Sequence, residues 1–163
     1  DNVSLDGQGN LRIVARTASG ITCYYGACRY TSGKITTRGK MSAAPGRVEA
    51  RIKLPSGQGL WPAFWMLGNG FPGVPWPACG ELDIMESMGS APTGTSSAIH
   101  GPGYSGNTPF ALLARTTYQR FLPIRIGVPW RRLFTRRPEA PTRRPLNLKR
   151  LLVVSASNAL LRP

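Results

Sequence analysis

The clearest pattern of apolar and polar positions lies in GRVEARIKLP, residues 46–55. Four apolar residues alternate there with four charged ones: Val48, Ala50, Ile52 and Leu54 with Arg47, Glu49, Arg51 and Lys53. Successive side chains of a strand point to opposite faces. The alternation therefore predicts a β-strand with one buried face and one solvated face.

Shorter β-rich segments recur along the chain, separated by turn residues. We expect further strands at 11–16, 21–25, 34–37, 60–67, 80–88 and 95–101, and one short strand or helix within 148–161. The 19 glycines and 15 prolines among 163 residues also favour turns over a helical bundle. Together these features predict an all-β fold, an antiparallel sandwich or barrel. No apolar run approaches the roughly 20 residues of a transmembrane helix, and the first residues do not resemble a signal peptide.

The stretch GELDIMESMG, residues 80–89, breaks the strand alternation. Glu81 and Asp83 keep the two-residue period, whereas Glu86 has the opposite parity. A β-bulge at about Ile84 and Met85 would insert one extra residue and return Glu86 to the face of the other two acids. We therefore expect three carboxylates on one face of a strand whose other face is buried.

Three clustered carboxylates are open to three interpretations. A retaining glycosidase uses two carboxyl groups roughly 5–5.5 Å apart, one as nucleophile and one as acid/base. Crowding of like charges raises the pKa of at least one acid and keeps it protonated. The same oxygens could instead hold calcium, or the acids could form a solvated edge with no chemistry. Spacing alone does not decide among these.

The aromatic residues nearby favour the glycosidase. Trp61, Trp65 and Trp76 precede the acids, and His100 follows them. Aromatic faces stack on the C–H faces of sugar rings. A single tryptophan is more often a core residue, and a single histidine is more often structural. Three tryptophans in a Gly/Pro-rich setting reverse that expectation for at least one of them.

The net charge of +14 is concentrated in the last third of the chain. Residues 1–106 carry nine Lys/Arg against six acids, whereas residues 107–163 carry twelve against Glu139 alone. This tail is rich in Arg and Pro, keeps no periodicity, and is predicted to be disordered. It would bind polyanions only incidentally, because it lacks the aromatic interleaving of a stacking platform. No specific nucleic-acid partner is expected.

The three cysteines form no CxxC pair. Cys23 and Cys28 flank YYGA and could close a hairpin disulfide in an oxidising compartment. Zinc is not expected, because the single histidine, His100, is far away in sequence and no second cysteine pair exists.

Several motifs in residues 1–106 resemble, in the same order, those of family sixteen of the glycoside hydrolases and of its bacterial endo-1,3-β-glucanases (laminarinases). They are GRVEARIKLPSGQGLWPAFWMLG, WPACGELDIMESMG with the family's E-x-D-x-x-E signature, and IHGPGYSG. The resemblance implies a β-jelly-roll sandwich and secretion, and we expect a monomer whose partner is a β-glucan polysaccharide and not a membrane. It also implies retaining hydrolysis of β-1,3-glucan with no cofactor, although the family includes members with a structural calcium.

The resemblance also implies a role for each residue of the motif. By position, Glu81 would be the nucleophile, Asp83 its modulator and Glu86 the acid/base. The residues that would line the substrate cleft are Trp61, Trp65, Trp76 and His100.

The resemblance ends at about residue 106, and it therefore predicts an incomplete sandwich. Family members continue with strands rich in aromatic and acidic residues, and the amino end of this chain begins at what resembles an early strand. We hypothesise that residues 107–163 are the product of a shifted reading frame, which translation of the other two frames would test. We accordingly expect weak or no activity from this chain. The alternative is a non-catalytic β-glucan-binding protein of the same fold, although such proteins typically lose one of the acids.

Overall fold

The structure, a computed structural model, describes residues 2–24, 26–43, 48–115, 122–126 and 150–158. Every regular element in these ranges is a β-strand, which confirms the all-β prediction. The strands are β1 (Val3–Leu5), β2 (Leu11–Ile13), β3 (Arg16–Thr17), β4 (Thr22–Cys23), β5 (Gly26–Ala27), β6 (Tyr30–Thr31), β7 (Gly33–Thr36), β8 (Val48–Ile52), β9 (Leu60–Gly68), β10 (Glu81–Glu86), β11 (Gly94–His100), β12 (Phe110–Arg115), β13 (Leu122–Ile126) and β14 (Arg150–Asn158). None of the described residues forms a helix with the length and hydropathy of a membrane span.

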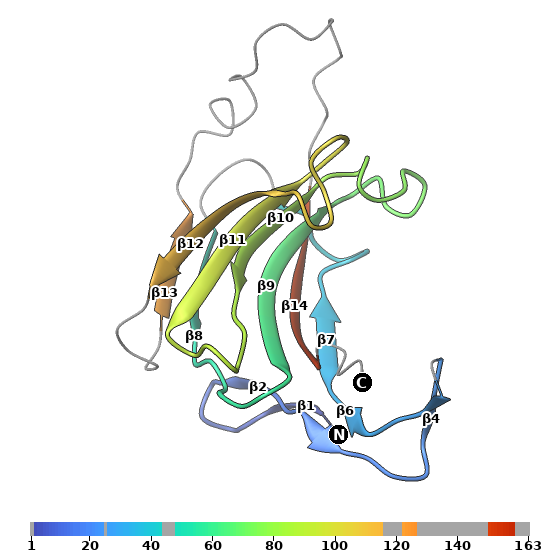
Figure 1. The fold of residues 1–163 in the computed structure, drawn as a ribbon, viewed down its shortest axis with the longest axis vertical. Coiled ribbons are helices and arrows are strands. Elements are labelled where there is room, and N and C mark those ends of the chain that lie inside the picture. Colours follow the sequence, from blue (N-terminus) through green and yellow to red (C-terminus); the bar gives the residue numbers. More distant parts are fainter. Residues whose placement is uncertain (1, 25, 44–47, 116–121, 127–149, 159–163) are drawn as a thin grey trace, which may run out of the picture.

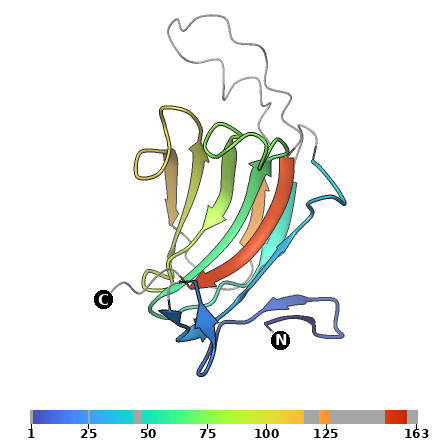
Figure 2. The same ribbon diagram turned by 90° about the vertical axis from the view of Figure 1, so that its right-hand side faces the viewer.

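Six of these strands form the main sheet, in the spatial order β12, β11, β10, β9, β14 and β7. Each neighbouring pair is antiparallel, and the strands curve together across the molecule (Figure 1). The strand β8 pairs with β13 in a separate sheet, beside the main one (Figure 2). The amino-terminal strands form three small pairs, β1 with β2, β3 with β6, and β4 with β5.

The hydrophobic core lies between the main sheet and β8. Its buried members come from β9 and β10: Phe64, Met66, Leu82, Ile84 and Met85. The apolar half of the alternating segment packs against them, namely Val48, Ala50, Ile52 and Leu54. The charged half of that segment that the structure describes, Glu49, Arg51 and Lys53, is exposed. Two antiparallel layers with a shared core confirm the predicted sandwich.

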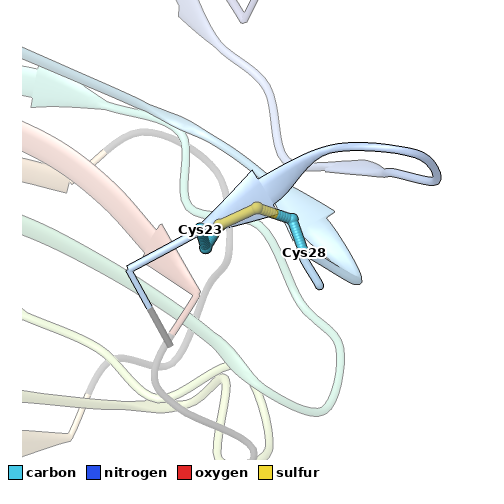
Figure 3. The surroundings of a disulfide bond; sticks show 2 residues. All are labelled: Cys23 and Cys28. Carbon is cyan, nitrogen blue, oxygen red and sulfur yellow. A yellow bond between two sulfur atoms is a disulfide. The ribbon is translucent and has the colours of Figure 1, made fainter. Parts of the chain in front are cut away.

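The cysteines of the amino-terminal hairpin are bonded, in agreement with their spacing. Cys23 and Cys28 form a disulfide across the β4–β5 pair, with their Cα atoms 5.3 Å apart (Figure 3). Gly26 has a φ of 109°, a conformation that side chains rarely adopt and that suits the tight turn. Cys79 is a buried free thiol, and burial raises its pKa.

Residues 107–163 contain more regular structure than the sequence predicted. The strands β12 and β13 were not expected, whereas β14 falls within 148–161, where one element was expected. β12 gave no signal because its Phe110, Leu112 and Leu113 are all exposed, so its residues do not alternate between core and solvent. Backbone pairing of six residues with β11 fixes it instead. The rest of the predicted tail, 116–121, 127–149 and 159–163, lies outside the described residues, and the division at residue 106 stays a prediction.

Candidate active site

The acidic strand β10 contains the predicted bulge. Asp83 pairs with Trp65 on β9, but Met85 pairs with the next residue, Phe64, so Ile84 is an extra residue relative to β9. The pairing with β11 shifts at the same place. Because paired residues of neighbouring strands point to the same face, the shift restores the parity of the last acid.

The shift places the three carboxylates on one face of the main sheet. Glu86 pairs with Ala63, and Asp83 pairs with Trp65 two positions further along β9. Glu81 precedes Asp83 by two residues and shares its face. We call this surface the acidic face. The opposite face of β10 is the hydrophobic core, so the acids have an apolar layer directly behind them.

The outer two carboxylates each accept a hydrogen bond from an indole. Trp61 on β9 donates from Nε1 to Oε1 of Glu86 over 2.9 Å. Trp76, in the loop between β9 and β10, donates from Nε1 to Oε2 of Glu81. Two of the predicted tryptophans are thus placed against the two acids that would carry the chemistry. These two hydrogen bonds orient the carboxylates of Glu86 and Glu81.

The middle carboxylate contacts the single histidine of the chain. Nε2 of His100 lies 3.0 Å from Oδ2 of Asp83, and both side chains are largely buried. His100 is the last residue of β11 and pairs in register with Glu81. The ring of Trp76 lies 5.9 Å from the imidazole, centroid to centroid. The 69–80 and 101–109 loops extend from one end of the main sheet (Figure 1). This end also holds Glu81, His100 and Trp76.

A basic residue that the sequence analysis did not single out also lies at the acidic face. Nζ of Lys34 is 5.7 Å from the ring centroid of Trp65. Lys34 belongs to β7, which is separated from β9 by β14. Its KITT segment carries no motif, and only the strand order of the sheet brings it near Trp65. The structure therefore brings together all seven predicted site residues and adds one cation.

Burial and like charge shift the pKa values of two acids upward. Burial, followed by the negative charges of Glu81 and Glu86, raises the pKa of Asp83 to about 8. This shift favours the protonated form of Asp83 near neutral pH. Burial also raises the pKa of Glu86, against the opposing effect of the hydrogen bond from Trp61. A neutral middle acid allows the three groups to share one dry surface without three full charges.

Two glycines let the loop that carries Trp76 close against the sheet. A Cβ on Gly68 would lie 1.8 Å from the carbonyl oxygen of Cys79, so only glycine fits there. Gly80 has a φ of 76° and directly precedes Glu81. Its carbonyl accepts a hydrogen bond from the amide of Gly68. These contacts fix the start of β10 and hence the position of Glu81.

The arrangement suits acid/base and nucleophilic chemistry on a sugar. Among the described residues, no group of three or more His, Cys, Asp or Glu side chains is arranged to hold a metal ion. The model of the family described as "Glycosyl hydrolases family 16" matches residues 2–122. The chain belongs to this family. The match covers the whole acidic face and extends beyond residue 106, where the sequence resemblance was expected to end.

Several relatives of this chain are named for action on β-glucan or for binding to it. A glucan endo-1,3-β-glucosidase A1 of Niallia circulans is 48% identical over 75 residues, which are 46% of this chain and 11% of that protein. A β-1,3-glucan-binding protein of Penaeus monodon is 37% identical over 114 residues, which cover 61% of this chain and 30% of that protein. The chain thus spans less than a third of the length of either relative.

A solved structure extends the comparison to the fold. The endo-β-1,3-glucanase from Pyrococcus furiosus superposes with a TM-score of 0.81 and 32% sequence identity, covering 95% of this chain and 66% of that one. Such coverage is too large for residues 1–106 alone, so it includes strands from the carboxy-terminal part. The sandwich is a jelly roll of the laminarinase type, as the resemblance implied.

Proposed function

We propose that this chain carries the catalytic acids of a retaining endo-β-1,3-glucanase. Glu81 is the nucleophile, Glu86 the acid/base and Asp83 the modulator of Glu81. The observation that carries the proposal is the acidic face itself: three carboxylates on one side of a bulged strand, with an indole donor on each outer acid and the histidine on the middle one.

The surroundings of the outer acids support a distinct task for each of them. Burial raises the pKa of Glu86, which suits an acid that must deliver a proton to the glycosidic oxygen as that bond breaks. Glu81 attacks the anomeric carbon and forms a glycosyl ester. Glu86, now a carboxylate, then removes a proton from the water that hydrolyses the ester. Both acids thereby return to their starting protonation states.

The middle acid acts on the nucleophile without touching the substrate. The raised pKa of Asp83 favours its neutral form, and a side-chain hydrogen bond with Glu81 is one of the causes of that rise. A neutral donor beside Glu81 stabilises the carboxylate before attack and does not add a second charge next to it. Trp76, which is 42% exposed, has indole surface available for a sugar ring near the acid it orients. Trp65, beside Asp83 on the same face, is a second platform for the substrate.

Azide rescue of two alanine variants tests the assignment. The substrate is an activated aryl β-laminaribioside. Glu86→Ala should still form the glycosyl ester from this substrate, and azide should convert the ester to a β-glycosyl azide. Glu81→Ala should give the α-glycosyl azide, because azide then replaces the nucleophile. The stereochemistry of each product is read by proton NMR. Identical products from the two variants, or an inverted anomer from the unchanged protein, would contradict the assignment.

Glucan binding without turnover is the second candidate, favoured by the glucan-binding relative of Penaeus monodon. Sedimentation with insoluble β-1,3-glucan measures binding, and reducing-sugar release from laminarin measures turnover. The retention of all three acids supports the enzyme. Binding with no sugar release from the unchanged chain, and no loss of binding in Glu81→Gln, would favour the binding protein.

We also propose that the protein acts outside the cell as a monomer. The Cys23–Cys28 disulfide supports an oxidising compartment. The partner is then a β-glucan polysaccharide and not a nucleic acid or a membrane. Measuring the molecular mass of the protein in solution tests whether it is a monomer.

A further inference from the structure

The two nitrogens of His100 have contrasting surroundings. Nε2 lies 3.0 Å from Oδ2 of Asp83. Nδ1 is buried, and none of the described residues forms a hydrogen bond with it. Within the part of the chain that the structure describes, the imidazole is therefore held by Nε2 alone, and a proton on Nδ1 would meet no acceptor.

This contrast selects one protonation state of the ring. An imidazolium, or a neutral ring protonated at Nδ1, would bury an N–H group without an acceptor, which is costly. The second of these would also require Asp83 to donate through Oδ2. The neutral ring protonated at Nε2 instead donates to Asp83 and leaves only a lone pair unpaired.

We propose that His100 is a positioning residue whose neutral ring, protonated at Nε2, holds Asp83 so that the carboxyl proton of Asp83 lies on the oxygen that faces Glu81. Oδ2 accepts from the imidazole and is not the oxygen that carries the proton. Oδ1 therefore carries it and donates to Glu81, with which Asp83 shares a hydrogen bond. The histidine thus fixes the direction of a donor that the nucleophile uses.

The charged groups around Asp83 act in both directions, because the two glutamates favour a proton on the ring and the lysine opposes it. Glu81 and Glu86 lie on the same strand and face, and Lys34 lies over Trp65, the partner of Asp83 on β9. The raised pKa of Asp83 is caused first by burial and then by the two glutamates. A protonated Asp83 removes the negative charge that would otherwise attract a second proton to the ring.

Nitrogen NMR of the full chain tests the protonation state directly. His100 is the only histidine, so labelling with ¹⁵N-histidine gives one ring to observe. At pH 7.5 we expect a proton bonded to Nε2 and a bare Nδ1. In Asp83→Ala the ring should lose this fixed proton, which then exchanges rapidly with water, whereas Trp76→Phe should keep it. A proton on Nδ1, or an Nε2 proton equally protected in Asp83→Ala, would overturn the proposal.

The positioning role rests on the proposed function and has a separate test. Glutamine can place an amide donor near the position of Nε2, whereas the shorter asparagine reaches only the position of Nδ1. On laminarin we expect His100→Asn to lower kcat about tenfold or more, the cost of losing a hydrogen bond to a carboxyl group, with little change in KM. His100→Gln should retain most of kcat. Equal losses in both variants would overturn the positioning role. Because weak or no activity is expected from this chain, absence of hydrolysis would bear on the proposed function only, and the NMR result would then decide the proposal for His100.

Discussion

Asp83→Asn replaces a buried carboxyl group with a neutral amide of nearly the same shape. Asp83 is 4% exposed, and its pKa is raised from 3.8 to about 8 by burial and by the neighbouring glutamates. Between these two values the folded chain holds a proton that the unfolded chain has lost. The stabilisation is therefore complete below the unfolded pKa and disappears as pH rises through the folded one.

The size of the effect follows from the difference between the two pKa values. About four pKa units at about 1.4 kcal/mol each amount to about 6 kcal/mol of unfolding free energy lost between pH 4 and pH 8. The asparagine variant does not titrate. Its amide nitrogen can donate to Glu81 and its oxygen can accept from His100, as the protonated Asp83 does. We expect similar stability of both proteins near pH 4 and a variant that is more stable by several kcal/mol at pH 8.5.

Urea unfolding followed by tryptophan fluorescence from pH 4 to pH 9 measures this difference. Asp6→Asn is the matched control, because the side chain of Asn10 lowers the pKa of the exposed Asp6 and shifts it in the opposite direction. That variant should keep the fall in stability between pH 4 and pH 8. An Asp83→Asn profile parallel to that of the unchanged protein would refute the reasoning, because the buried acid would then not hold its proton.

Three further predictions concern the surroundings of the acids. Trp61→Phe removes the hydrogen bond that lowers the pKa of Glu86, so its pKa should rise and the alkaline limb of the pH–activity profile should move to higher pH. Gly68→Ala should destabilise the fold by about 3 kcal/mol or more in urea unfolding, whereas Gly94→Ala, whose Cβ meets only an ordinary contact at 3.5 Å, should cost much less. Cys23→Ser removes the Cys23–Cys28 disulfide and should lower the free energy of unfolding by about 2 kcal/mol, because this disulfide closes only a short loop. The NMR signals of the acidic face should stay unchanged.

The acidic face could be predicted from the sequence because its causes are local. The two-residue period of a strand and one parity break at Glu86 were enough to locate the bulge. The alternating charges of 46–55 likewise identified the outer layer of the sandwich. Both patterns arise from the contrast between core and solvent within a few consecutive residues, which is why a single sequence carries them.

The features that sequence reasoning missed depend on contacts between distant segments. Lys34 reaches Trp65 because β14 pairs with both β7 and β9, an order that no local pattern encodes. The exposed strand β12 has no apolar periodicity and is defined by its backbone pairing. The individual roles of Trp61 and Trp76 as donors to different acids also required the register, since the sequence placed both only near the acids.

The bulge explains why three apolar residues can share six positions with three acids. Leu82, Ile84 and Met85 all enter the core, and two consecutive core residues are impossible in a regular strand because neighbours point to opposite faces. The extra residue gives the core both Ile84 and Met85 and also returns Glu86 to the acidic face. Packing and chemistry thus require the same irregularity. Apolar packing of Ile84 and Met85 therefore stabilises the register on which the alignment of the carboxylates depends.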